Sequence, residues 1–122
     1  MDRTSIKDQI KALRSLKQFD EYNDLFFDSE GLNWLDEVFE QYYPKKWPPP
    51  YLYPALDGAV SVEWDQFKIG EVSLTILLQK HIAIINYWFK FSDNDTSEIL
   101  DLNNHFHWEY LIQLLTGLFD DL

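Results

Sequence analysis

The sequence predicts an α+β fold: a three-stranded antiparallel meander with helices packed mainly on one face, in the order α-α-β-β-β-α. Apolar residues recur at helical spacing in two segments near the N-terminus and one near the C-terminus. Between them, apolar and polar residues alternate as in half-buried strands, after a run of prolines that no helix could contain. The 122 residues, 46% of them hydrophobic, are enough for one core, so we expect a single domain over residues 1–122.

The first helix is expected at about residues 5–18. Ser5 and Asp8 resemble a capping box at its start, and Ile6 and Ile10 begin the helical spacing of apolar residues. A stripe of basic residues runs beside this apolar face: Arg3, Lys7, Lys11 and Arg14. We expect the stems of these side chains to cover the helix edge, with their charges in water or facing acidic residues of the second helix.

The second helix is expected at about residues 32–43. Its apolar positions follow the helical period: Leu32, Leu35, Val38, Phe39 and Tyr42. Its solvated side carries Asp36, Glu37 and Glu40. Pro44 must end the helix, because proline cannot continue its hydrogen-bond ladder.

Residues 44–58 are expected to form a proline-rich connector between the helices and the sheet. Proline fixes φ and lacks a backbone N–H, so Pro50 and Pro54 favour polyproline II over a helix or a central strand. Three aromatic side chains are expected to hold the connector against the domain: Trp47, Tyr51 and Tyr53. Residues 48–51 also match the proline-tyrosine pattern that WW domains bind, although a packed connector explains them better.

The sheet is expected over residues 59–91. Its strands are expected at about 59–65, 71–79 and 82–91. Asp57 and Gly58 supply the turn into the first strand, because both residue types favour turns. In that strand apolar and polar residues alternate, which places Trp64 in the core and Glu63 in water. The last strand is apolar on both faces and should be covered twice, by a helix, the connector or another copy of the protein.

The C-terminal helix is expected at about residues 104–119, after a polar loop at 92–97. Its apolar side contains Phe106, Tyr110 or Trp108, Leu111, Leu114, Leu115 and Leu118. With this helix, the predicted fold has helices both before and after its sheet.

Three residues near the start of this helix suggest a metal site: His105, His107 and Glu109. On a helix His105 and Glu109 share a face but His107 points away from both, so we predict no metal there. The stretch from Asp93 begins like a calcium loop, but Glu98 stands where such a loop needs glycine. No phosphate-binding loop or nucleophile motif occurs. We therefore predict no catalytic residue, no cofactor and no enzymatic activity, with a metal-dependent hydrolase as the less favoured alternative.

The net charge is −11, and the charges are unevenly distributed along the chain. Half of the ten Lys and Arg residues lie in the first seventeen positions, whereas residues 18–43 contain eight acids and neither Lys nor Arg. An acidic surface repels phosphate backbones, so we expect no nucleic-acid partner. The sequence has no cysteine, no apolar run long enough to span a bilayer and no signal-peptide pattern, so we expect a cytoplasmic protein without a membrane partner.

Residues 53–64 read Tyr-Pro-Ala-Leu-Asp-Gly-Ala-Val-Ser-Val-Glu-Trp. This segment resembles one shared by a family of small uncharacterised bacterial proteins, whose pattern is Tyr-Pro-Thr-x-x-Gly-Gly-Val-x-x-Glu-Trp after a proline-rich stretch. Ala55 stands where the family has threonine, and Ala59 where it has the second glycine. The resemblance implies a bacterial, cytosolic α+β protein, and it carries over no catalytic residue.

Together these observations predict a non-enzymatic acidic module that binds another protein with a basic surface, as an antitoxin-like or immunity-like inhibitor would. Aromatic residues make up 17% of the chain, and large aromatic side chains suit interfaces. The acidic residues expected to contact the partner are Asp36, Glu37, Glu40 and Glu63. The alternative is a homo-oligomeric structural protein, such as a homodimer, built on the apolar strand at 82–91.

Overall fold

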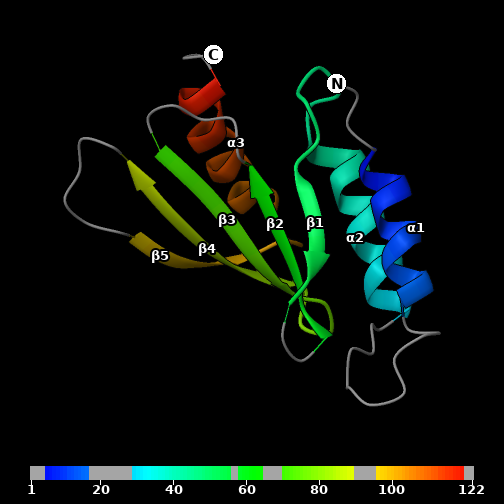
Figure 1. Ribbon diagram of the computed structural model, residues 1–122. Helices are drawn as coiled ribbons and strands as arrows, with labels where there is room; N and C mark the ends of the chain where they lie inside the picture. Colours follow the sequence, from blue (N-terminus) through cyan, green and yellow to red (C-terminus); the bar gives the residue numbers. More distant parts are fainter. Residues whose placement is uncertain (1–4, 17–28, 56–57, 65–69, 90–95, 120–122) are drawn as a thin grey trace.

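A computed structural model describes residues 5–16, 29–55, 58–64, 70–89 and 96–119, and over these residues the chain forms three helices and one five-stranded sheet (Figure 1). In chain order the elements are α1 (Ile6–Leu16), α2 (Ser29–Tyr42), β1 (Tyr51–Pro54), β2 (Val60–Trp64), β3 (Gly70–Leu77), β4 (Ile82–Phe89), β5 (Thr96–Asp101) and α3 (His105–Phe119). Neighbouring strands are antiparallel, and their order in the sheet is their order in the chain.

The fold is α+β, but the expected three-stranded meander is wrong, because two further strands extend the sheet at its two ends. β1 lies inside the proline-rich segment that was expected to be a connector. β5 begins in the segment that was expected to be a polar loop. The element order is therefore α-α-β-β-β-β-β-α.

The hydrogen-bond phase of the sheet explains how a proline-rich segment can form β1. The Ala55 N–H donates to the Ala59 carbonyl at 2.9 Å, and the register of β1 with β2 continues from this pair. In this register Ala55, Tyr53 and Tyr51 exchange backbone hydrogen bonds with β2. The backbone N–H and C=O groups of the alternate residues are directed away from β2. Pro50 and Pro54 belong to the outward set, so their missing N–H groups remove no bond between the strands.

β5 has a weak sequence signal because it is short and half polar. Leu100 faces the core and is 4% exposed, whereas Ile99 faces outward and is 67% exposed. The strand is fixed by its pairing with β4, which uses six residues of β5. This pairing places β4 inside the sheet, between β3 and β5.

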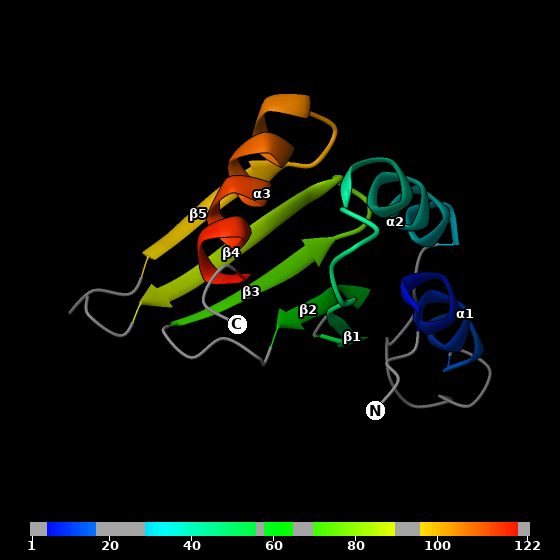
Figure 2. The same ribbon diagram turned by 90° about the horizontal axis from the view of Figure 1, so that it is seen from above.

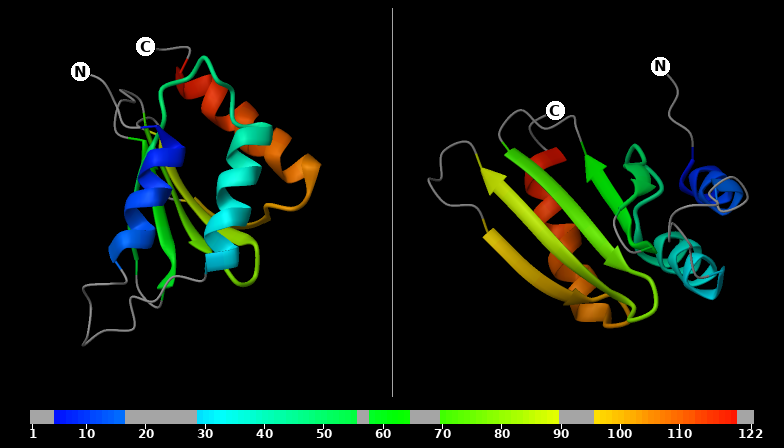
Figure 3. Two further views of the ribbon diagram at one scale, coloured as in Figure 1. Left: turned by 90° about the vertical axis from the view of Figure 1, so that its right-hand side faces the viewer. Right: turned by 60° about the horizontal axis from the view of Figure 1, so that its bottom comes forward.

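Within the described residues, the helices leave one face of the sheet uncovered (Figures 2 and 3). α3 lies across the sheet and α2 stands on the same side, while α1 packs against α2 and β1 (Figures 2 and 3). The largest fully buried side chains come from helices and strands alike: Ile10, Leu32, Leu35, Leu74, Ile76, Ile85, Leu102, Trp108, Leu111 and Leu115. The core therefore lies between the helices and one face of the sheet, as sheet-and-helix layers require.

Aromatic hydrogen bonds fasten the proline-rich segment to this core. The Tyr43 hydroxyl donates to the Pro48 carbonyl at 2.6 Å and accepts from Trp64 Nε1 at 3.1 Å. Trp64 is 4% exposed and Pro50 is also buried. Gly58 has a φ of 76°, a left-handed conformation that favours glycine.

Several expected features lie outside the described residues: the end of the first helix at 17–18, Asp57, the end of the last expected strand at 90–91, and residues 92–95 of the polar loop.

A hydrogen-bonded cluster joins α2 to the β3–β4 turn and the β5–α3 turn. Trp34 Nε1 donates to Asn103 Oδ1 at 2.8 Å, and the Asn103 amide nitrogen lies 3.0 Å from His81 Nδ1. Because an indole only donates, it fixes the Asn103 amide so that its nitrogen donates to His81. The His81 and Trp34 rings stack with centroids 4.1 Å apart, and His81 holds a φ of 58°. The cluster therefore fixes both turns against α2.

Candidate functional site

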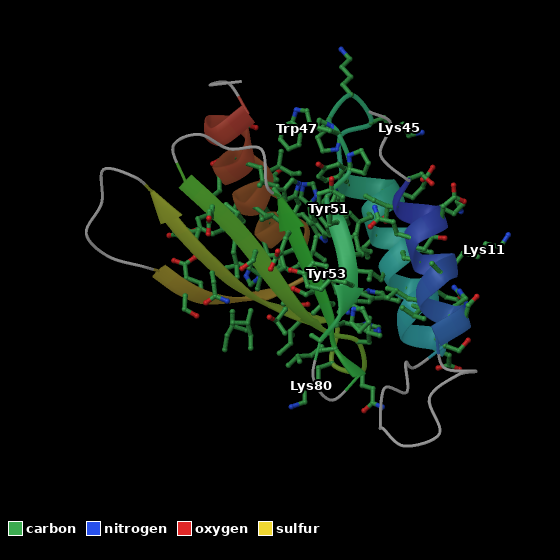
Figure 4. The ribbon with its side chains drawn as sticks, in the orientation of Figure 1. Lys11, Lys45, Trp47, Tyr51, Tyr53 and Lys80 are labelled. Atoms are coloured by element: carbon green, nitrogen blue, oxygen red, sulfur yellow. The ribbon has the colours of Figure 1, made fainter. Side chains whose placement is uncertain are left out.

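The uncovered side of the sheet is the strongest candidate for a binding surface, and we call it the open face. It is turned toward the viewer in Figure 1, and Figure 4 shows Tyr51 and Tyr53 projecting from β1 on this side. Tyr51 is 39% exposed, Tyr53 38% and Ile99 67%. Tyr51 and Tyr53 lie on the first strand of the sheet and Ile99 on the last, and exposed large side chains on an uncovered face are typical of an interaction surface.

The strand register aligns side chains from every strand across the open face. Tyr53 pairs with Ser61, and Ser61 pairs with Thr75. Thr75 pairs with Ile84, and Ile84 pairs with Ile99. These residues form one row that begins and ends with an exposed large side chain. A partner lying across the sheet could contact the whole row.

The open face is acidic. Glu63 is exposed in the neighbouring row, where it pairs with Tyr51 and Ser73. The strands of the sheet contain the acids Glu63, Glu71, Glu98 and Asp101 but neither Lys nor Arg. Lys80 extends from the β3–β4 turn and Lys11 from α1, both away from the sheet (Figure 4). A cationic partner would therefore meet no like charge on any strand.

Glu63 also acts on Tyr53, its neighbour on the open face. Partial burial and then a hydrogen bond to the Glu63 carboxylate raise the pKa of Tyr53 above its usual value. The Tyr53 hydroxyl therefore stays protonated and donates to Glu63. An aromatic ring beside a carboxylate suits the side chain of a lysine or arginine, which can contact both.

A second tyrosine–glutamate pair lies at the β5 end of the sheet, on the side that α3 covers. Hydrogen bonds to Glu98 and then to Tyr87 raise the pKa of Tyr110 above its usual value. The hydroxyl oxygens of Tyr87 and Tyr110 are 3.2 Å apart. These contacts fasten α3 to β4 and β5, and they leave the half-buried Glu98 carboxylate near the rim of the sheet.

Two of the three acidic residues predicted on α2, Asp36 and Glu40, lie beside lysines of the same chain. A groove of about 520 Å³ runs between the start of α1, the end of α2 and the proline-rich segment, and it contains Asp36 and Glu40. Lys7 Nζ lies 3.2 Å from Asp36 Oδ2, and Lys45 Nζ lies 3.8 Å from Glu40 Oε1. The first contact agrees with the expectation that the basic helix faces the acidic one. A basic partner would have to compete with these two lysines.

The four residues predicted to contact a partner lie on two separate surfaces. Asp36, Glu37 and Glu40 belong to α2, where Glu37 is exposed, whereas Glu63 lies on the open face. Of these two surfaces, the open face is the one that combines an acidic side chain with exposed tyrosines. We therefore take the open face as the candidate site.

The histidines near the start of α3 contact the protein itself. His105 Nε2 lies 2.9 Å from Glu109 Oε1, one helical turn away. His107 Nδ1 accepts the Asp101 N–H at 2.7 Å. Among the residues that the structure describes, no group of three or more His, Cys, Asp or Glu side chains is placed to hold a metal ion. His107 therefore caps a backbone group of β5.

No protein-family model, curated protein or solved structure matches the chain. The resemblance of residues 53–64 to a bacterial family therefore stays a prediction. In the described part of the chain, none of the helices is both long and apolar enough to cross a membrane.

Sequence reasoning missed three residues of the open face: Tyr51, Tyr53 and Ile99. The alternation of Tyr51, Leu52 and Tyr53 is the pattern of a strand with one buried face, and Leu52 is indeed 8% exposed. The prolines on both sides favour polyproline II and hide this signal. For Ile99, the short polar stretch around it gives no comparable pattern.

Proposed function

We propose that this protein is a non-enzymatic binding module whose open face docks a basic surface of another protein. The observation that carries the proposal is that exposed Tyr51 and Tyr53 on β1, Glu63 on β2 and Ile99 on β5 share one uncovered sheet face, and that the strands contain no Lys or Arg. Interfaces favour such aromatic residues at their centres, and charge complementarity selects the partner. A small acidic domain of this kind suits a cytoplasmic inhibitor, such as an antitoxin-like or immunity-like protein that neutralises a basic toxin or nuclease.

Charge and apolar contact would act at different stages of binding. A net charge of −11 speeds the encounter with a basic partner, and this acceleration weakens as salt concentration rises. Burial of Tyr53 and Ile99 then slows dissociation, and a central tyrosine of an interface typically contributes about 2 kcal/mol or more when truncated to alanine. The affinity should therefore have a salt-sensitive part and a salt-resistant part.

The test begins with proteins captured from source cells, and the decisive measurement uses the purified pair. Tyr53→Ala and Ile99→Ala should each weaken the affinity about tenfold or more, mainly by raising the dissociation rate. Glu63→Gln and Glu37→Gln form a matched pair, because each removes one charge from an exposed glutamate and only Glu63 lies on the open face. Surface plasmon resonance at several salt concentrations should show slower association for Glu63→Gln than for Glu37→Gln.

Two outcomes would contradict the proposal. One is a partner whose binding is unaffected by Tyr53→Ala and Ile99→Ala but weakened by Glu37→Gln, which would move the site to α2. The other is the lack of any captured protein that dissociates as salt is raised.

A second copy of the chain is the alternative occupant of the open face, because Ile84 and Ile99 would be covered in a homodimer. Light scattering at micromolar concentration distinguishes a homo-oligomer from a monomer that binds a different protein. A monomer rules out the homo-oligomer, whereas a dimer that Ile99→Lys dissociates would support it.

A further inference from the structure

The outer edge of β5 presents backbone hydrogen-bonding groups that no other residue bonds in the described part of the chain. The Leu102 N–H donates to the His81 carbonyl at 3.0 Å, and the register of β4 with β5 continues from this pair. In an antiparallel pair, alternate residues direct their N–H and C=O toward the neighbouring strand. Ser97, Ile99 and Asp101 fall between those residues, so their backbone groups point outward, beyond the sheet.

The chain itself caps the last of these residues. The Asp101 N–H donates to His107 Nδ1 at 2.7 Å, and the Asp101 carbonyl accepts the Asn104 N–H at 2.9 Å. The strand order ends at β5, and in Figure 3 no described element lies beyond it. Ser97 and Ile99 therefore each present an N–H and a C=O to the outside.

β5 also lacks two of the features that usually prevent an edge strand from pairing, lysine and proline. Proteins protect such edges with lysine, proline, a bulge or a covering helix. The segment Thr96–Asp101 contains neither lysine nor proline, and Ile99 is 67% exposed. This edge is therefore competent to pair with an added strand.

We propose that β5 accepts an extended segment of the partner protein as a sixth strand, with an apolar residue beside Ile99 and a lysine or arginine beside Glu98. This inference rests on the proposed protein-binding function and names the partner's chemistry. The apolar residue would extend the row that Ile84 and Ile99 form on the open face. The basic residue would reach the Glu98 carboxylate near the rim, on a sheet without Lys or Arg.

A second copy of β5 fits this edge poorly. A two-fold pairing that matches Ser97 with Ile99 places Glu98 of one copy opposite Glu98 of the other, and directly opposed like charges repel. A two-fold pairing that matches Ile99 with itself places Ser97 opposite Asp101, whose N–H and C=O are already bonded within the chain. A segment of different sequence avoids both conflicts.

A synthetic peptide that alternates valine and lysine, with blocked ends, is the probe for this edge. In an antiparallel sixth strand, a valine opposite Ile99 exchanges backbone hydrogen bonds with Ile99. A control peptide of the same sequence with N-methylated valines, the methylated twin, keeps every side chain and charge but loses the valine N–H donors. NMR titration should show protection of the Ser97 and Ile99 amides and at least tenfold weaker binding of the methylated twin. A valine–glutamate peptide should bind at least tenfold more weakly than the valine–lysine peptide.

Protein variants give an independent readout. Ile99→Pro removes the outward N–H without removing a bond to β4, so the fold is retained and peptide affinity should fall tenfold or more. Ile99→Thr keeps the N–H and should lose only about threefold, since it removes apolar contact alone. Glu98→Gln should weaken the lysine peptide severalfold, and Tyr110→Phe controls for the lost tyrosine contact.

Equal affinity of the peptide and its methylated twin would overturn the inference, as would an unprotected Ile99 amide at saturating peptide or no binding at millimolar peptide. The proposed docking on the open face would survive these results, because it is tested separately by Tyr53→Ala with the purified partner. A partner that is lost in Tyr53→Ala, and that Ile99→Pro weakens no more than Ile99→Ala does, would likewise reject the added strand and keep the open face.

Discussion

The two edges of the sheet are closed to different degrees. At β1, the Gln9 side chain of α1 occupies the edge: its Nε2 donates to the Pro50 carbonyl at 2.8 Å, and its Oε1 accepts the Leu52 N–H at 2.7 Å. At β5, Ser97 and Ile99 face outward with no described element beyond them. At the β1 edge, the Gln9 side chain thus takes the place of a neighbouring strand, and we call this the closed edge. At the β5 edge, the open edge, the outward backbone N–H and C=O groups of Ser97 and Ile99 remain able to pair with an added strand.

The residue types agree with this difference. Pro54 at the end of β1 and Pro50 just before it both direct their backbone nitrogens outward, where proline also prevents pairing with another chain. β5 has no proline, and its outward Ile99 favours pairing. The edge at β1 therefore contributes to the stability of the fold, whereas the edge at β5 suits the proposed pairing with a partner strand.

The largest effect is expected from Gly58→Val, which breaks the turn that presents β1 to β2. Gly58 has a φ of 76°, where a β-branched side chain is strained, so the variant should lose about 2–3 kcal/mol of unfolding free energy. Urea denaturation measures the loss. Gly58→Asn is the control, because asparagine tolerates the left-handed region, and a valine variant as stable as the asparagine variant would contradict the strained turn.

Gln9→Ala should open the closed edge at a cost of about 2 kcal/mol, because it removes two hydrogen bonds and leaves the Leu52 N–H without its acceptor. Gln9→Glu is the matched control: it keeps an acceptor for Leu52 but loses the donor to Pro50, so its stability should lie between wild type and Gln9→Ala. If Gln9→Ala unfolds at the same urea concentration as wild type, the side-chain amide does not close the edge.

His107→Ala should lengthen the open edge by releasing the Asp101 N–H, with a loss of about 1 kcal/mol. Faster amide exchange at Asp101 is the direct readout. His105→Ala is the control on the same helix, because the exposed His105–Glu109 contact should contribute less than about 0.5 kcal/mol. Equal effects of the two substitutions would show that His107 caps nothing.

The smallest effect concerns alkaline pH. The folded protein holds the Tyr110 proton more tightly than the unfolded chain, because the hydrogen bond to Glu98 raises the pKa of Tyr110 above 10.0. This stability is fully present below pH 10.0 and is lost as pH rises through the folded-state pKa. Tyr110→Phe should flatten the decline in unfolding free energy above that pH, and an unchanged slope would contradict the contact at β5.

Much of the fold could be predicted from the sequence because its signals are local. Helical spacing indicates α1, α2 and α3, alternation of apolar and polar residues indicates β2 and β3, and a run of apolar residues indicates β4. β1 and β5 could not be predicted in this way, because they depend on partners far along the chain. β1 is hydrogen-bonded to the Gln9 side chain, and β5 is hydrogen-bonded to β4. This tertiary pairing overrides the local conformational preference of a proline-rich segment and of a polar segment.

The candidate site could be predicted only in part, for a related reason. Alternation places Glu63 in water, and it lies on the open face. Which face stays uncovered depends on the side where α2 and α3 pack, so Tyr51 and Ile99 could not be assigned to a surface beforehand. The acids of α2 were visible in the sequence, but their lysine neighbours come from α1 and from the segment after α2.

Residue-resolved amide hydrogen exchange is the most direct test of the central claim that one edge is closed by the chain and the other is left for a partner. In the free monomer, the Leu52 amide should exchange slowly and the Ser97 and Ile99 amides rapidly, and the valine–lysine peptide should slow only the latter two. An Ile99 amide as protected as Leu52 in the free monomer, or one that the peptide leaves unprotected, would contradict it.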